Sequence, residues 1–220
     1  MAAPRPRHAA PPAAPGPPPP PPRNEGNPAA FRESLAGALA AADVAALLLR
    51  LGAGDERTQI NHIKALAPLA QAEGVAVLLD GAPQLVARSG ADGVHMGGLA
   101  ALDGALRDRP PDRIVGIGGL ASRHEAMTAG EAGVDYVMFG EPDAADRRPG
   151  FAAVLERVAW WAELFEIPCV GYAASLEEVE GLAAASPEFI ALGDAAWSAP
   201  EGPAAVLRAA ARLLAPEPAR

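Results

Sequence analysis

The sequence predicts a parallel α/β fold of the (β/α)8 TIM-barrel type, and three observations support this. Short apolar runs alternate with longer helical stretches, the runs lack the alternation of a half-exposed sheet, and one pattern around them recurs. Strands that are apolar throughout are typical of a parallel sheet with helices on both faces. Seven such runs are recognisable, one fewer than a closed barrel of this type has.

The recurring pattern places an acid before a short apolar run and a glycine after it. It occurs at residues 91–97, 134–140 and 187–193, so the closing glycines are 43 and then 53 residues apart. Each interval has the length of about two β/α units of a barrel. We expect the acids at the strand entrances, where they serve stability, and the glycines at the exits, where active sites lie.

The expected elements follow one another regularly along the chain. The expected strands are Val44–Arg50, Val75–Leu79, Gly93–Met96, Arg113–Ile117, Tyr136–Phe139, Cys169–Tyr172 and Phe189–Leu192. The expected helices are Phe31–Ala41, Thr58–Gln71, a short one from Pro83, Leu99–Arg107, Ser122–Glu131, Phe151–Phe165, Leu176–Ala184 and Pro203–Leu214. Gly90 and Gly133 end two of them, because glycine readily adopts a left-handed C-cap. Trp161 and Phe165 share one helix face, which predicts packing against the sheet.

Residues 1–28 differ in composition from the rest of the chain, since they hold 12 of its 24 prolines. Proline removes a backbone donor and favours an extended conformation, so this segment cannot join a sheet interior. We therefore expect a disordered Pro/Ala-rich tail at 1–28 and a single barrel domain at 29–220. The tail stands where the first barrel strand should be. Either the tail fills that gap poorly, or a homo-oligomer covers it, or the first coding stretch is misassigned.

Charge and cysteine content exclude several classes of protein. The 220 residues carry a formal charge of −9, which makes the chain a poor binder of nucleic acid. A single cysteine excludes a disulfide framework and a cysteine-based metal site. No apolar run reaches the roughly 18 residues of a membrane span, and the N-terminus has no secretory signal. The expected location is the cytoplasm.

The segment Val75–Gly97 (VAVLLDGAPQLVARSGADGVHMG) resembles the middle of the thiamine phosphate synthases, in which Ala-Asp-Gly-Val-His-Leu-Gly follows an Asn-Asp strand exit. Gly133–Gly140 is similar to the later Asp-Tyr strand of that family, and Ile114–Gly118 to the strand before it. The resemblance spans about residues 31–214. It implies a (β/α)8 transferase of thiamine biosynthesis that couples hydroxymethylpyrimidine pyrophosphate to thiazole phosphate with Mg²⁺.

Most positions that carry the family's chemistry differ in this chain. The Gln-x-Arg-x-Lys strand exit that grips pyrophosphate keeps only its arginine, Arg50. Of the metal-binding positions only Asp80 remains, since the others fall on Gly81 and Ala100, which puts the implied Mg²⁺ in doubt. The resemblance thus assigns Arg50 and Asp80 as catalytic residues, with Asp80 also as the metal ligand.

The phosphate end of the site is changed as well. The Gly-Gly that cups the thiazole phosphate falls on Ala173 and Ala174, and the final serine falls on Asp194. The loop after the Asp-Tyr strand has lost its lysine. A carboxylate at the position of Asp194 repels a phosphate rather than binding it.

Several residues at expected strand exits could still contact a ligand. Gly116, Gly118 and Gly119 could present backbone N–H groups to an anion, or form a plain turn into the next helix. His95 could donate to a ligand oxygen or be a structural histidine, and Tyr172 could line the pocket. These five residues are the ligand-binding candidates.

Two classes of function follow. The first is a thiamine-phosphate-synthase-like protein with a degenerate active site, a pseudoenzyme or a weak enzyme in which Arg50 steadies the pyrophosphate and Asp80 holds a metal. The alternative is a non-catalytic binding or regulatory paralogue for a small phosphorylated or heterocyclic ligand, or a scaffold that acts through its Pro-rich tail. A direct assay of thiamine phosphate formation separates them.

Overall fold

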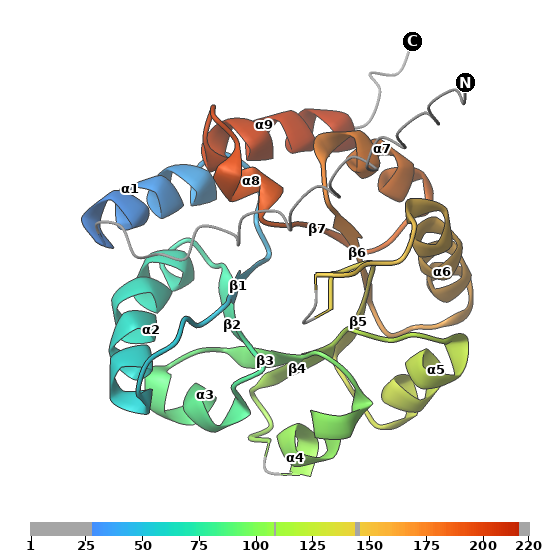
Figure 1. Ribbon diagram of the computed structural model, residues 1–220, viewed down its shortest axis with the longest axis horizontal. Coiled ribbons are helices and arrows are strands. Elements are labelled where there is room, and N and C mark those ends of the chain that lie inside the picture. Colours follow the sequence, from blue (N-terminus) through green and yellow to red (C-terminus); the bar gives the residue numbers. More distant parts are fainter. Residues whose placement is uncertain (1–27, 108, 144–145, 216–220) are drawn as a thin grey trace, which may run out of the picture.

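In the computed structural model, which describes residues 28–107, 109–143 and 146–215, seven parallel strands curl into a barrel-like ring inside a layer of helices (Figure 1). The strands pair strictly in chain order, each with the next. They are β1 (Ala46–Leu49), β2 (Ala76–Asp80), β3 (Gly93–Met96), β4 (Ile114–Ile117), β5 (Tyr136–Phe139), β6 (Cys169–Ala173) and β7 (Phe189–Leu192). The predicted α/β barrel class and all seven strands are confirmed. The predicted tail, apart from its last residue, lies outside the described residues.

The helices also follow the expected order. They are α1 (Pro28–Leu39), α2 (Glu56–Gln71), α3 (Pro83–Ser89), the 3₁₀ helix η1 (Leu99–Ala101), α4 (Leu102–Arg107), α5 (Arg123–Glu131), α6 (Phe151–Leu164), α7 (Leu176–Ala184), α8 (Ala195–Ser198) and α9 (Pro203–Leu214). The sequence did not predict α8, because a single turn is too short to show helical periodicity. No helix in the described part of the chain is long and apolar enough to cross a bilayer.

The acid before each repeated strand bonds to the backbone of the preceding strand. Each carboxylate accepts a hydrogen bond from an N–H of β2, β4 or β6: Asp92 from Val77 at 2.8 Å, Asp135 from Val115 at 2.7 Å and Glu188 from Cys169 at 2.7 Å. Each acid therefore links two neighbouring strands where both enter the sheet. Their position at the strand entrances is as expected, and an unsatisfied backbone N–H at such a place costs about 1–3 kcal/mol, so their role in stability stays a prediction that this geometry supports.

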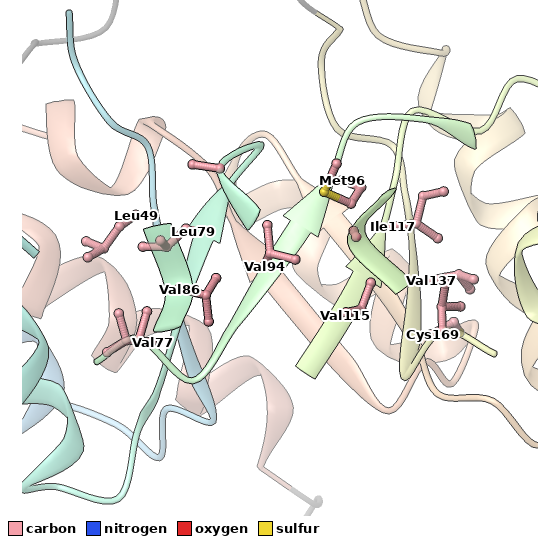
Figure 2. Close-up of a cluster of buried hydrophobic side chains, with 14 of the residues drawn as sticks. Leu49, Val77, Leu79, Val86, Val94, Met96, Val115, Ile117, Val137 and Cys169 are labelled. Carbon is pink, nitrogen blue, oxygen red and sulfur yellow. The ribbon is translucent and has the colours of Figure 1, made fainter. Parts of the chain in front are cut away.

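The core lies between the strands and the surrounding helices. Buried side chains such as Leu79, Val94 and Ile117 gather along successive strands (Figure 2). Trp161 of α6 is fully buried, stacks on Phe165 at 4.1 Å between ring centroids, and donates from its indole nitrogen to the carbonyl of Ile167 at 2.7 Å. The predicted aromatic face of this helix therefore packs inward.

The ring of strands is open between β1 and β7, because these two strands do not pair with each other in the described structure. Both edges are poorly covered: Leu49 is the one buried residue of β1, β7 has none, and Phe189 is 48% exposed. The helix layer continues across this gap, where α1 packs against α9 (Figure 1). The rings of Phe31 and Trp197 lie there in a tilted arrangement, with their centroids 5.4 Å apart. Among the described residues the strand layer is thus open between β1 and β7, while the helix layer closes.

A cavity of about 590 Å³ lies beside this gap, between β7, α7 and α9. Its lining is mostly apolar and includes Val179, Ile190, Leu192 and Leu207, with Asp43 as its one charged residue among those described. The exposed side chains of Leu213 and Leu214 stand near the end of α9, and Leu214 also lines the cavity. The cavity therefore lies along the unpaired edge of β7 in the described part of the chain.

Candidate functional site

The ends of β1, β2 and β7 meet at one cluster of charges. Arg50 follows β1, and its Nε donates to Oδ2 of Asp80, the last residue of β2, at 2.9 Å. Its Nη1 donates to Oδ2 of Asp194, which follows β7, at 3.4 Å. The hydrogen bond with Asp80 raises the pKa of the Arg50 guanidinium above its ordinary value. Arg50 therefore spans the open edge of the sheet and has both carboxylates as partners.

Tyr172 of β6 lines the same mouth of the barrel. Its hydroxyl lies against Gly193, where a Cβ atom would overlap it. Burial and the charge of Asp194 raise the pKa of Tyr172. The guanidinium carbon of Arg148 lies 5.7 Å from the centre of its ring. The structure thus places Tyr172 beside Asp194 and near Arg50, as a residue that lines the exit of the sheet.

His95 is 2% exposed and takes part in a buried polar chain of three side chains. Its Nε2 lies 2.9 Å from Oε2 of Glu141, and its Nδ1 lies 2.8 Å from the Tyr136 hydroxyl. Burial is the first cause that raises the pKa of Tyr136, so the phenol keeps its proton and can donate it to Nδ1. In the tautomer that accepts this proton at Nδ1, Nε2 of His95 donates to Glu141, so both ring nitrogens have a partner.

Two of the candidate glycines make room for this chain. A Cβ atom at Gly116 would overlap the ring of Tyr136, and one at Gly118 would overlap the carboxylate of Glu141. Larger residues at either position would therefore displace Tyr136 or Glu141. The exit of β4 is glycine-rich because side chains from the next strand and its loop lie across it.

The same segment has its own backbone contacts. The N–H of Gly118 donates to the carbonyl of Met96 at 2.8 Å, so it is already engaged. Gly119 adopts a φ of +63°, and a Cβ there would lie 2.7 Å from the carbonyl oxygen of Gly97. These contacts explain why glycines stand at the exit of β4. Anion binding by the segment stays a prediction.

Arg148 and Glu178 form a second ion pair at the ends of β5 and β6. Nη1 of Arg148 lies 2.9 Å from both carboxylate oxygens of Glu178. Oε2 of Glu178 also accepts the N–H of Ala174 at 2.9 Å, at the entry to α7. The remaining nitrogens of Arg148 donate to the carbonyls of Gly140, at 3.1 Å, and Tyr172, at 3.4 Å. The pair ties two strand exits to the start of α7.

A cavity of about 210 Å³ opens at the ends of β6 and β7, under α8. Two acidic residues, Glu177 and Glu201, line it, and no arginine or lysine of the described chain does. Its lining residues are Ala173, Ala174, Ser175, Leu176, Glu177, Leu192, Gly193, Ala196, Ala199, Glu201 and Val206. The cavity can hold a small ring, and its charge is unfavourable for an anion.

The donor set at this mouth does not fit Mg²⁺. The ion prefers about six oxygens, with one or two carboxylates among them. Asp80 is bonded to Arg50, and the other matched positions are Gly81 and Ala100, which have no side-chain oxygen. Among the described residues there is no group of three or more histidine, cysteine or acidic side chains placed to hold a metal.

Sequence reasoning missed three residues of the site: Glu141, Tyr136 and Glu178. One signal could have found Glu141, because it directly follows the closing glycine of the repeat, as Asp194 does. Residues at that place leave the strand at the mouth of the barrel. No comparable signal marks Glu178, whose partner Arg148 is 30 positions away in the sequence.

Comparison with known proteins gives consistent results. The family model described as "Thiamine monophosphate synthase" matches residues 23–196. The thiamine-phosphate synthase of Rhodospirillum centenum is 40% identical over 184 residues, which are 82% of this chain and 89% of that protein. The protein of the same name from Hyphomonas neptunium is 37% identical over 191 residues, 84% of this chain and 86% of its own length.

Solved structures show the same fold at lower identity. The thiamine phosphate pyrophosphorylase from Pyrococcus furiosus superimposes with a TM-score of 0.69 at 19% identity, covering 83% of this chain and 88% of that one. The 3-hexulose-6-phosphate synthase from Salmonella typhimurium superimposes with a TM-score of 0.59, also at 19% identity, over 76% and 85% of the two chains. At such identities the likeness concerns the architecture alone.

Proposed function

The chain belongs to the thiamine monophosphate synthase family, as its resemblance indicated, and on this premise we propose that its coupling site is degenerate. The family's reaction joins a pyrimidine pyrophosphate to a thiazole phosphate. In this chain the mouth of the barrel binds a small heterocycle, and coupling proceeds at least ~100-fold more slowly than at an intact site. The expected cytoplasmic location belongs to the same proposal.

The observation that carries the proposal is the engagement of Arg50. A leaving pyrophosphate needs positive charge placed before the bond breaks, and one such group commonly contributes 10²–10³ in rate. Arg50 is the one basic side chain kept at a position matched to the family's pyrophosphate grip, and it is bonded to Asp80 and Asp194. A pyrophosphate would have to displace two carboxylates to reach it.

The Mg²⁺ implied by the family would face the same obstacle. When bound, it would neutralise charge on the leaving group. Asp80 is the residue that would hold the ion, but its carboxylate already accepts a hydrogen bond from Arg50. The two other positions matched to the family's metal ligands are Gly81 and Ala100, which have no side-chain oxygen. We therefore assign no step of this chain's chemistry to the metal.

The test is a turnover assay of the full chain with Mg²⁺ and both substrates, run beside the Rhodospirillum centenum relative. We expect a rate at least ~100-fold below that of the relative, and no further loss in Arg50→Ala. Robust turnover that collapses in Arg50→Ala would overturn the proposal and establish a rearranged, working site.

A second candidate function is ligand binding without turnover. It is favoured by the chain of hydrogen bonds from Tyr136 through His95 to Glu141, which is fully formed. The lysine and the metal ligands that turnover would need are missing. Such a site is preorganised for a ligand that contacts the carboxylate of Glu141. Calorimetric titration with a hydroxymethylpyrimidine alcohol tests it: binding with no detectable turnover supports this function, and no binding in a folded protein excludes it.

A further inference from the structure

We propose that the carboxylate of Glu178 occupies the anion position at the start of α7, so that the adjoining cavity accepts an unphosphorylated heterocycle in preference to its phosphate ester. The inference rests on the proposed function for the heterocyclic class of the ligand. It adds that the site prefers the unphosphorylated form of that ligand and that Glu178 causes this preference.

The first argument is the set of donors around Glu178. A guanidinium and a backbone N–H at the entry to a helix are the donors with which proteins bind phosphate. Here Arg148 and the N–H of Ala174 point at one place, and the carboxylate of Glu178 fills it, with three contacts of 2.9 Å. The carboxylate of Glu178 thus accepts the hydrogen bonds that these donors would otherwise offer to a phosphate.

The second argument is that Arg148 cannot readily turn to another anion. Its Nε and Nη2 are bonded to the carbonyls of Gly140 and Tyr172, and its charge lies over the ring of Tyr172. Its side chain is 22% exposed, against 80% for the neighbouring Arg147. Three groups, namely two carbonyls and one ring, therefore hold the guanidinium in place against Glu178.

The third argument is the charge of the mouth as a whole. Arg50 is bonded to Asp80 and Asp194, so the other arginine at these strand exits is also occupied by carboxylates. The 210 Å³ cavity has Glu177 and Glu201 in its wall. A phosphate dianion there would meet these negative charges without a cation of its own.

The cavity nevertheless suits a neutral ring. Leu176, Leu192 and Val206 supply apolar surface, and Ser175 adds a hydroxyl at its wall. Its volume of about 210 Å³ is enough for a single heterocycle with short substituents. Apolar lining with few polar groups is typical of sites for small uncharged ligands.

The experiment compares hydroxyethylthiazole alcohol with its phosphate ester by calorimetry on the full chain. We expect the wild type to bind the alcohol at least about tenfold more tightly, because a dianion near carboxylates at short range is repelled by at least that factor. Glu178→Gln removes the charge but keeps an acceptor for Ala174, and Glu178→Ala vacates the position. Both should strengthen the binding of the ester and of inorganic phosphate about tenfold.

Glu180→Gln is the matched control, because it removes the same charge two residues later on α7, from an exposed side chain that does not line the cavity. We expect it to change phosphate affinity less than about twofold. Equal gains in Glu180→Gln and Glu178→Gln would overturn the proposal, since general charge would then explain the effect. A wild type that prefers the ester would overturn it as well.

The outcome stays distinct from that of the proposed function. Slow coupling together with a preference for the ester contradicts only this inference, and fast coupling contradicts only the degenerate site. If Glu178→Ala melts before binding can be measured, Glu178→Gln decides the matter. A rise in the melting temperature of Glu178→Ala on adding phosphate, without a rise in the wild type, supports the proposal.

Discussion

The two ends of the barrel both carry carboxylates, but the partners of these carboxylates differ. At the strand entrances Asp92, Asp135 and Glu188 accept backbone N–H groups of neighbouring strands. At the exits Asp80, Asp194, Glu141 and Glu178 each contact an arginine or histidine side chain. A carboxylate on a strand N–H cannot leave without disturbing the sheet, whereas one on a half-exposed guanidinium can exchange with a ligand. The same residue type thus has backbone partners at one end and side-chain partners at the other.

The largest expected loss of stability comes from a substitution at the exit end of the barrel. It limits the comparison, because close packing at this end also contributes to stability. In Gly116→Ala the new methyl group would overlap the ring of Tyr136, which must then move away from His95. We expect a loss of about 3 kcal/mol in the free energy of unfolding, measured in urea, because overpacking a fixed core costs that much. Gly104→Ala in α4 is the control, since no atom lies within 4 Å of its Cβ position, and it should raise stability slightly. A smaller loss than in Asp92→Ala would show that the ring moves easily.

The next prediction sharpens the role of the entrance acids. Asp92→Ala removes the acceptor of the Val77 N–H and of the Gln71 side chain. We expect the free energy of unfolding to fall by about 2 kcal/mol, because a buried N–H loses its partner. Ligand binding at the other end should not change. A stability loss below about 0.5 kcal/mol would remove the basis for assigning these acids to stability.

The pH dependence of stability tests the buried end of β6. Burial, and then the charge of Glu188, raise the pKa of the Cys169 thiol to about 12, from an ordinary value of 9.0. A thiol with a raised pKa in the folded state stabilises it fully below pH 9, and this stability is lost as pH rises from about 9 through 12. We expect a loss of about 1.4 kcal/mol at pH 10 relative to pH 8. In Cys169→Ala the free energy of unfolding should fall less between pH 8 and pH 10. If its pH dependence is unchanged, other groups are responsible for the loss.

The smallest expected effect is at the exit of β2. Asp80→Ala breaks the pair with Arg50, whose side chain is 54% exposed, so it should change the free energy of unfolding by less than about 1 kcal/mol. This is the same substitution as Asp92→Ala at the opposite end of the barrel. If the two variants lose equal stability in urea, the distinction between the two ends fails.

Much of the fold could be predicted from the sequence because the evidence is local. Strands such as Gly93–Met96 and Tyr136–Phe139 are bounded by an acid and a glycine and are mostly apolar, which is enough to place them to the residue. The four-residue α8 could not be placed in this way, because one turn has no period. The expectation that Trp161 and Phe165 pack together followed from helical spacing alone.

The candidate site could be predicted only in part. Arg50, Asp80, His95 and Tyr172 were expected at strand exits, and the structure places them there. That Arg50 would be bonded to Asp194 required the curl of the sheet, which brings the first and last strands to the same rim although the residues are 144 positions apart. Sequence spacing carries no information on such a contact.

The sequence by itself determined the order of elements and the acids at the entrances, because residue type and local period decide these. Only the tertiary structure decided which charges meet. It placed Glu178 on Arg148, and it filled the spaces at Gly116 and Gly118 with Tyr136 and Glu141. The physical reason is that a charge pair or a close contact depends on distance in space, and the closing of the barrel sets that distance between residues far apart in the chain.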